Sequence, residues 1–180
     1  MDRINLDKIA AEKAQEILAV RNKKVGKNLK NVDIKTLENL ATKVLGVIQE
    51  QGIYAGILFL FSRSGATNKK EKLDSEKIIC CYIATTLLNV LLHDSFKPWN
   101  FALTPTPLKW SDINLDSKKI ELLNELTKEN KLLDDIDKLL LIKSLYEQIL
   151  TYTRFSAKAA KIEAENKSNT DNTDLTDSHG

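Results

Sequence analysis

The chain has 180 residues, of which 42% are hydrophobic and 29% charged, with six glycines and three prolines. This length suits one compact domain, and this composition excludes a wholly disordered chain and argues against a many-turned β-sandwich or barrel. The formal net charge is +2, but residues 163–180 hold five acidic residues and one lysine, so residues 1–162 carry +6. Such asymmetry fits either a polyanionic partner or an ordinary soluble surface.

The N-terminal part of the chain shows three stretches with helical character. Residues 5–21 repeat apolar side chains at helical spacing, and residues 34–51 do so again after Asp33, a residue type that caps helices. Residues 21–30 break this pattern, so we expect a loop there. Residues 53–61 are apolar on every side, which favours a short central helix.

The middle of the chain combines a fourth helix with an irregular connection. We expect Asp74 or Ser75 to cap a helix that continues to His93. All three prolines fall in the connection that follows, residues 94–115, which predicts irregular structure. Three aromatic side chains of this connection are expected to tie it to the core, namely Trp99, Phe101 and Trp110.

The C-terminal part is predicted to hold two more helices and a tail. The helices cover residues 117–128 and 134–164, and the second carries an apolar stripe from Leu139 to Ala160. Residues 165–180 repeat small polar and acidic residues, which is typical of a disordered tail. The sequence therefore predicts an all-α fold, a compact bundle of about five to six helices in a single domain, residues 1–164, with a disordered acidic tail.

Catalytic chemistry is poorly represented in the sequence. Cys80 and Cys81 are adjacent, which suits neither a disulfide nor a zinc site, so we expect reduced, buried thiols. If Cys81 and His93 share one helix, they lie about 18 Å apart and cannot form a nucleophile–base pair. His93 is expected to end its helix. We therefore predict no enzyme and no cofactor.

Metal and membrane sites are not predicted either. Residues 112–116 begin like a calcium loop but lack its glycine and its closing glutamate, so a helix capped by Asp116 is favoured. The longest apolar runs are shorter than the roughly 20 residues that span a bilayer, and the first residues do not form a signal peptide. We expect a cytoplasmic protein without a membrane partner.

Three basic clusters remain as a candidate phosphate-binding surface, at residues 21–30, 63–72 and 154–161. Their candidate RNA-binding residues are Arg21, Lys23, Lys24, Lys27, Arg63, Lys69, Lys70, Arg154, Lys158 and Lys161. The last three share one helical face. Near Arg154 the only aromatic residues are Tyr152 and Phe155, and we expect core packing to account for at least one of them. Sequence-specific base reading is therefore not predicted.

Two stretches resemble a known family. Residues 39–61, in which Gly52 is followed at once by Ile53-Tyr54-Ala55-Gly56-Ile57-Leu58-Phe59-Leu60, are similar to the helix pair of the small all-helical subunit of Cmr-type type III CRISPR effector complexes. Residues 145–161 are similar to the closing helix of that family. Arg154, Phe155 and Lys158 stand at its matching positions.

The resemblance implies a non-catalytic subunit that works in antiviral defence. Such a subunit stacks with copies of itself into a filament and contacts guide and target RNA through basic side chains, while other CRISPR effector subunits cut. Which type III subtype it belongs to stays open. The alternative from the residues alone is a helical protein-interaction or regulatory module without nucleic-acid binding, and an enzyme that uses His93 ranks third.

Overall fold

A computed structural model describes most of the chain. The described residues are 4–25, 30–65, 74–99, 101, 103–104, 106–109, 111–114, 116–129 and 131–173, with the backbone alone at residues 24, 25, 30, 114 and 164–173. They form six α-helices, which confirms the all-α prediction: α1 (Leu6–Leu18), α2 (Ile34–Gln51), α3 (Ile53–Arg63), α4 (Ser75–Val90), α5 (Asp116–Leu126) and α6 (Ile136–Thr173).

Short elements fill the connections between these helices. They are four 3₁₀ helices, η1 (Ala19–Asn22), η2 (Asp94–Trp99), η3 (Asp112–Asn114) and η4 (Leu132–Asp134), and two strands, β1 (Lys24–Val25) and β2 (Lys30–Asn31). The strands pair antiparallel where we expected only a loop. The Val32 N–H extends this ladder by donating to the Lys23 carbonyl at 3.0 Å. Backbone groups at the two ends of the connection are thus hydrogen-bonded to each other.

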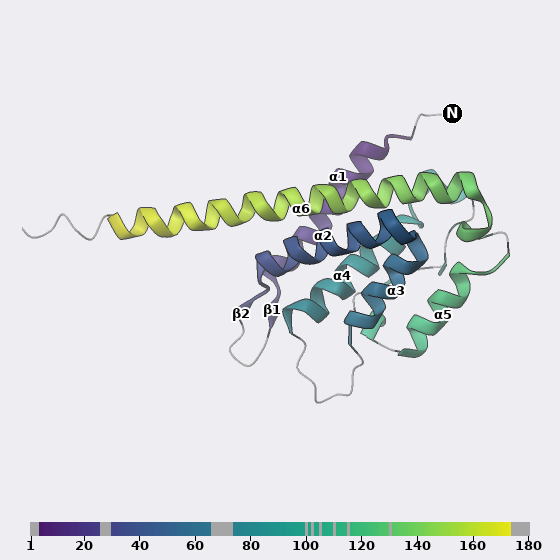
Figure 1. The fold of residues 1–180 in the computed structure, drawn as a ribbon, viewed down its shortest axis with the longest axis horizontal. Helices are drawn as coiled ribbons and strands as arrows, with labels where there is room; N and C mark the ends of the chain where they lie inside the picture. The colour runs from purple at the N-terminus through teal and green to yellow at the C-terminus, as the bar shows by residue number, and fades with distance from the viewer. Residues whose placement is uncertain are drawn as a thin grey trace, which may run out of the picture.

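The longest helix, α6, lies against both α1 and α2, and α3 and α4 pack behind α2. Figure 1 shows α6 running along one side of the molecule and extending beyond the other helices at its C-terminal end. At about 1.5 Å per residue, its 38 residues span about 57 Å. The β1–β2 hairpin and α5 lie at opposite ends of the molecule (Figure 1). Helix α6 therefore links those two ends.

The turn between α2 and α3 depends on Gly52. This residue has φ of 89°, a conformation that favours glycine, and its N–H donates to the Ile48 carbonyl at 2.9 Å. Helix α3 begins at the next residue, as predicted. One face of α3 is nevertheless exposed, because Tyr54 and Leu58 retain 38% and 46% exposure. The expectation of a helix buried on all sides was therefore wrong for this face.

The core is centred on α4, whose side chains are buried along most of its length. The Tyr146 hydroxyl of α6 reaches into it and donates to the Leu87 carbonyl at 2.6 Å, and its complete burial raises the pKa of this phenol. Helix α4 begins as predicted after Asp74, which accepts from the Lys77 N–H, but it ends at Val90, three residues before His93. The stripe predicted for α6 is buried at its centre, including Ile142.

The connection after α4 is tied down by aromatic packing, as predicted for two of the three residues. Phe101 is buried and Trp99 is half-buried, with ring centroids 5.4 Å apart. Phe96, which the prediction omitted, is fully buried and contacts both rings. Trp110 lies outside the described residues.

Two predicted boundaries near the C-terminus shift. Asp116 was expected to cap α5 from outside, but it is the first helical residue and its carboxylate pairs with the Lys119 ammonium at 3.3 Å. Helix α6 was expected to end at Ala164, and its backbone continues to Thr173. An uninterrupted hydrogen-bond ladder adds one bond for each residue fixed, so a helix propagates past its last packed side chain. Residues 174–180 lie outside the described residues, and the tail there stays a prediction.

Two glycine-to-alanine substitutions test the packing of α2 against α3. A Cβ on Gly56 would lie 2.4 Å from Cγ1 of the fully buried Ile48, whereas a Cβ on Gly46 would meet nothing within 4 Å. We expect Gly56→Ala to lower the free energy of unfolding by about 1–3 kcal/mol through overpacking. Gly46→Ala should raise it by up to about 1 kcal/mol, because alanine favours a helix. Urea denaturation measures both, and equal effects of the two substitutions would contradict this packing.

Candidate nucleic-acid interface

Three neighbouring elements of the N-terminal part meet the distant helix α6 at one end of the molecule. An open cavity of about 520 Å³ lies between η1, β2, the start of α2 and the C-terminal half of α6. Its lining includes Arg21, Asp33, Ala160 and Glu163. The start of α4 also lies there, because the Asp33 N–H donates to the Ser75 hydroxyl at 3.4 Å. The fold thus places Arg21 of the first basic cluster beside the turn of α6, residues 160–163, that includes Lys161 of the third.

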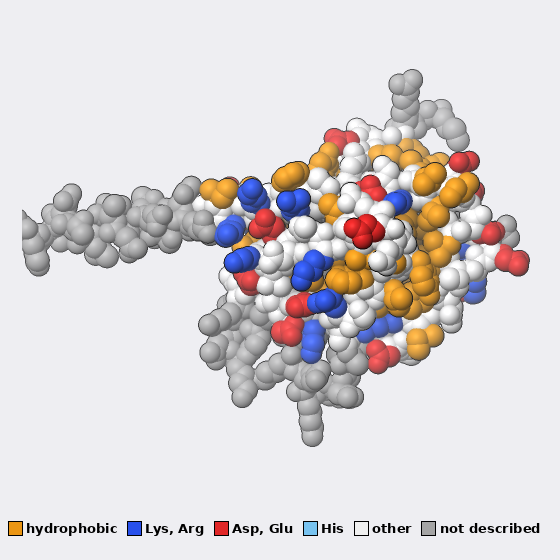
Figure 2. Space-filling model, in the orientation of Figure 1, with side chains coloured by type: hydrophobic (Ala, Val, Ile, Leu, Met, Phe, Trp, Pro, Cys, Tyr) orange, Lys and Arg blue, Asp and Glu red, His pale blue; other side chains and the backbone are white. Residues whose placement is uncertain are grey.

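The C-terminal half of α6 contributes exposed cations to this end. The side chains of Arg154 and Lys158 are exposed, and Lys161 is half-buried. Figure 2 shows Lys and Arg side chains gathered over this part of α6 and over the adjoining part of α2. In the described part of the chain, no ion pair is recorded for Arg154 or Lys158. We call Arg21, Arg154, Lys158 and Lys161 the basic end.

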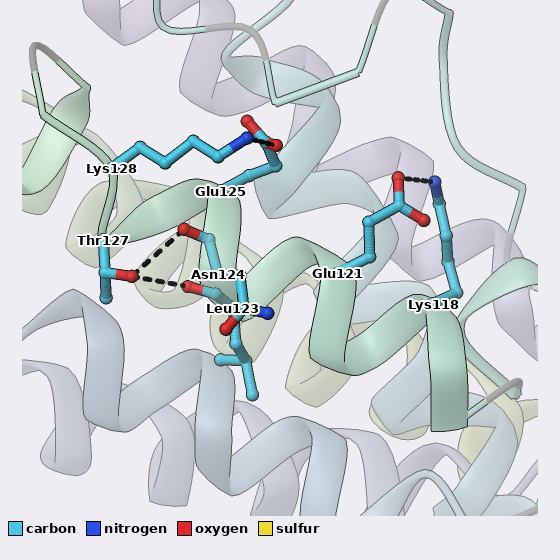
Figure 3. Close-up of polar contacts among 7 residues, drawn as sticks. All are labelled: Lys118, Glu121, Leu123, Asn124, Glu125, Thr127 and Lys128. Carbon is cyan, nitrogen blue, oxygen red and sulfur yellow. Dashed lines mark hydrogen bonds and ion pairs between the residues drawn. The ribbon is translucent and has the colours of Figure 1, made fainter.

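Helix α5 shows the contrasting arrangement, in which lysines are neutralised locally. Lys118 pairs with Glu121 at 2.6 Å within the helix, and Lys128, in the turn that follows the helix, pairs with Glu125 (Figure 3). The Lys128 contact lowers the pKa of Glu125. Such exposed pairs contribute little to stability, but they cancel charge where an anion would bind. The number of lysines in a segment therefore overstates its capacity to attract a polyanion.

The other predicted residues are only partly available to a ligand. Arg63 forms an ion pair with Glu76, and its guanidinium lies 4.8 Å from the Phe59 ring centroid. The ammonium of Lys23 lies 6.0 Å from the centroid of the Tyr82 ring. Arg63 is therefore less suited to phosphate binding than the sequence suggested. Lys27, Lys69 and Lys70 lie outside the described residues, as does the side chain of Lys24.

The sequence analysis missed one residue at this end and left open which of two aromatic residues packs against the core. Lys35 is exposed in the first turn of α2, beside Asp33, and its position inside a predicted helix hid it among ordinary surface lysines. Phe155 is 57% exposed, while Tyr152 is half-buried and its hydroxyl donates to Asp7 of α1. The aromatic residue that faces solvent is therefore Phe155.

Asp33 joins the cavity to the fold. Its carboxylate accepts from the Thr36 hydroxyl at 2.6 Å and from the N–H groups of Lys35 and Thr36. The Thr36 hydroxyl bond is the largest of the effects that hold the pKa of Asp33 below its usual range. The cap fixes where α2 begins, and with it the position of Lys35, which directly follows the cavity-lining Ile34.

The candidate catalytic groups are held in structural roles. Burial raises the pKa of Cys80 to about 12 and that of Cys81 to about 11, so both thiols stay protonated near neutral pH. Cys81 donates to the Ser64 carbonyl at 3.9 Å, and His93 Nδ1 accepts from the Ser95 N–H at 3.2 Å.

The described residues contain no cluster of three or more His, Cys, Asp or Glu side chains that could hold a metal ion. Among the described helices, none combines the length and the apolar character needed to cross a bilayer. Asp112, from the segment that begins like a calcium loop, accepts from the Lys109 N–H at 2.8 Å and so closes a turn.

Comparisons with protein-family models, characterised proteins and solved structures find no match for the chain.

Replacing Asp33 tests how the cap holds this end together. Asp33→Ala should lower the free energy of unfolding by about 1 kcal/mol near pH 7, and Asp33→Asn should lose much less because asparagine also caps. The lowered pKa means that the carboxylate stabilises the fold fully above its unfolded-state pKa of about 3.9 and loses this effect as pH falls through the folded-state value. Urea denaturation at about pH 7 and about pH 3 should show that the difference in free energy of unfolding between wild type and Asp33→Ala becomes smaller in acid. A difference that does not depend on pH would contradict the role assigned to Asp33.

Thiol titration tests the state of the two cysteines. Because both thiols are buried and have raised pKa values, the folded protein should react with a chromogenic disulfide reagent slowly at about pH 8. Both should react at once in denaturing urea. Rapid reaction of one thiol in the folded protein would show that it is accessible and active.

Proposed function

We propose that the protein is a non-catalytic, RNA-binding structural subunit of a type III CRISPR effector complex. The observation that carries this proposal is that Arg21 of η1 lies beside the C-terminal half of α6, which exposes Arg154 and Lys158. Exposed cations attract the phosphate backbone independently of sequence, as a subunit that lies along guide and target RNA requires.

The assignment to a type III complex is supported by the residues that resemble its small subunit. The pair α2 and α3, joined directly at Gly52, matches the arrangement that the resemblance implies, and Arg154 and Lys158 lie in the matching closing helix. In this proposal, copies of the chain stack head to tail, so that the basic ends follow the RNA while neighbouring subunits supply catalysis. Heterologous contacts of this kind propagate into open filaments.

A second candidate, a helical protein-interaction module without RNA, is favoured by an exposed apolar surface. Figure 2 shows hydrophobic side chains gathered over α3 and the first half of α6, and the large hydrophobic residues of these two segments that keep substantial exposure are Tyr54, Leu58, Ile136 and Leu140. A large exposed apolar patch marks an interaction site for another protein. Purification from native cells separates the candidates. RNA of uniform length with several large proteins supports the first, and one protein partner without RNA supports the second.

Charge reversal on α6 tests the RNA-binding proposal. The double substitution Arg154→Glu with Lys158→Glu should weaken binding of a short single-stranded RNA and flatten the salt dependence of the binding constant. The expected loss is about 0.7 in the slope of log K against log salt for each phosphate contact removed. Fluorescence anisotropy over about 50–200 mM salt measures both quantities, and circular dichroism checks that helicity is retained.

The matched control is Lys118→Glu with Lys128→Glu, which changes the net charge by the same amount on α5 and just after it. Those lysines are already paired with glutamates, so the control should keep most of the wild-type affinity and its salt slope. Equal losses in both variants would mean that only net charge matters. Unchanged binding in the α6 variant would refute the proposed interface.

A further inference from the structure

The Phe155 side chain points away from the core that α6 helps to build. Its neighbours two positions away on either side, Thr153 and Ala157, are fully buried, whereas Phe155 is 57% exposed. At 3.6 residues per turn, this pattern puts the ring on the outer face of the helix. Folding therefore does not account for a large apolar ring at this position.

Cations flank the exposed ring. The Arg154 guanidinium lies 5.8 Å from the ring centroid, and the exposed Lys158 follows three residues later on the same side of the helix. Other cation–ring contacts in the described chain involve Phe59, Tyr82 and Phe101, whose rings are buried or half-buried. Phe155 thus combines a nearby cation with a ring that an outside group can reach.

We propose that Phe155 is a stacking site for an unpaired nucleobase of single-stranded RNA, with Arg154 and Lys158 binding the phosphates on either side. This inference rests on the proposed RNA-binding function and adds the kind of RNA structure that the surface selects. Every base presents a flat π face, so stacking on an aromatic ring does not require a particular sequence. Bases within a duplex are already stacked on each other, so they cannot use the site.

The charges around the ring favour RNA over a protein as its occupant. Arg154 and Lys158 lie within three residues of Phe155, and the nearest acidic residues along α6 are Glu147 and Glu163, each about two turns away. A polyanion with aromatic bases complements both the cations and the ring. The apolar surface over α3 and the start of α6 lacks this combination.

Four single variants and two RNAs test the stacking site. The RNAs are an oligoadenylate of about 12 nucleotides and a duplex of the same length, and the variants are Phe155→Ala, Phe155→Leu, Phe155→Trp and Ile162→Ala. Ile162 is a matched control, because it is 50% exposed two turns further along α6 and has no π system. We expect Phe155→Ala and Phe155→Leu to weaken oligoadenylate binding about tenfold and to leave duplex binding unchanged. Ile162→Ala should stay within about twofold of wild type for both RNAs.

Phe155→Trp provides a direct signal of stacking. It should retain oligoadenylate affinity, and its added indole fluorescence should be quenched by the single strand but not by the duplex. Wild type, which has two tryptophans, supplies the background signal.

Distinct outcomes overturn the inference and the function on which it rests. If Phe155→Leu binds the oligoadenylate with wild-type affinity, the contact is apolar and does not involve stacking. If Phe155→Ala also binds it as wild type does, while the double variant Arg154→Glu with Lys158→Glu binds more weakly, the stacking site is refuted and the RNA-binding function stands. A changed oligomeric state of Phe155→Ala on gel filtration with unchanged RNA affinity would identify a contact between protein copies and also overturn stacking. Wild type that binds neither RNA would refute both proposals.

Discussion

The burial of one face of α6 against α1 and α2 is the constraint on which the rest of the structure depends. Fully buried small side chains occur on all three helices, with Ala10 and Ala14 on α1, Ala41 on α2 and Ala157 on α6. Their size lets the helices approach closely, and close packing of apolar groups supplies most of the driving force for folding. The Tyr146 hydroxyl adds a buried hydrogen bond to α4, so α6 contacts three helices at once.

This packing also determines what α6 presents to solvent. Once Thr153 and Ala157 face the core, Arg154, Phe155 and Lys158 must face outward, because the helical period fixes their relative directions. The same helix carries exposed apolar residues near its start and basic residues beyond its middle. One rigid element therefore connects a surface suited to a protein neighbour with a surface suited to a polyanion, as the proposed role in an assembly requires.

Local ion pairing decides which of the many cations remain available. Lys118 on α5 and Lys128 just after it have glutamates three residues away and are neutralised, and Arg63 is neutralised by Glu76 on another helix. The first kind of pair can be read from sequence spacing, since residues three apart on a helix are neighbours. The second kind cannot, because the two partners come from separate helices. For that reason the sequence placed Arg63 beside Arg154 as an equal candidate.

The sequence by itself determined the helices, the cap at Asp33 and the turn at Gly52, because periodicity, capping and glycine conformation are interactions within a few residues. Only the tertiary structure decided that Arg21 and Glu163 line one cavity and that Tyr152 is held against α1. Tyr152 stands at the edge of the predicted apolar stripe, whereas Phe155 lies between Thr153 and Ala157 and so faces away from the stripe by the helical period alone. The partial burial of Tyr152 depends on α1, whose Asp7 accepts its hydroxyl, and no local pattern in the sequence specifies where α1 packs.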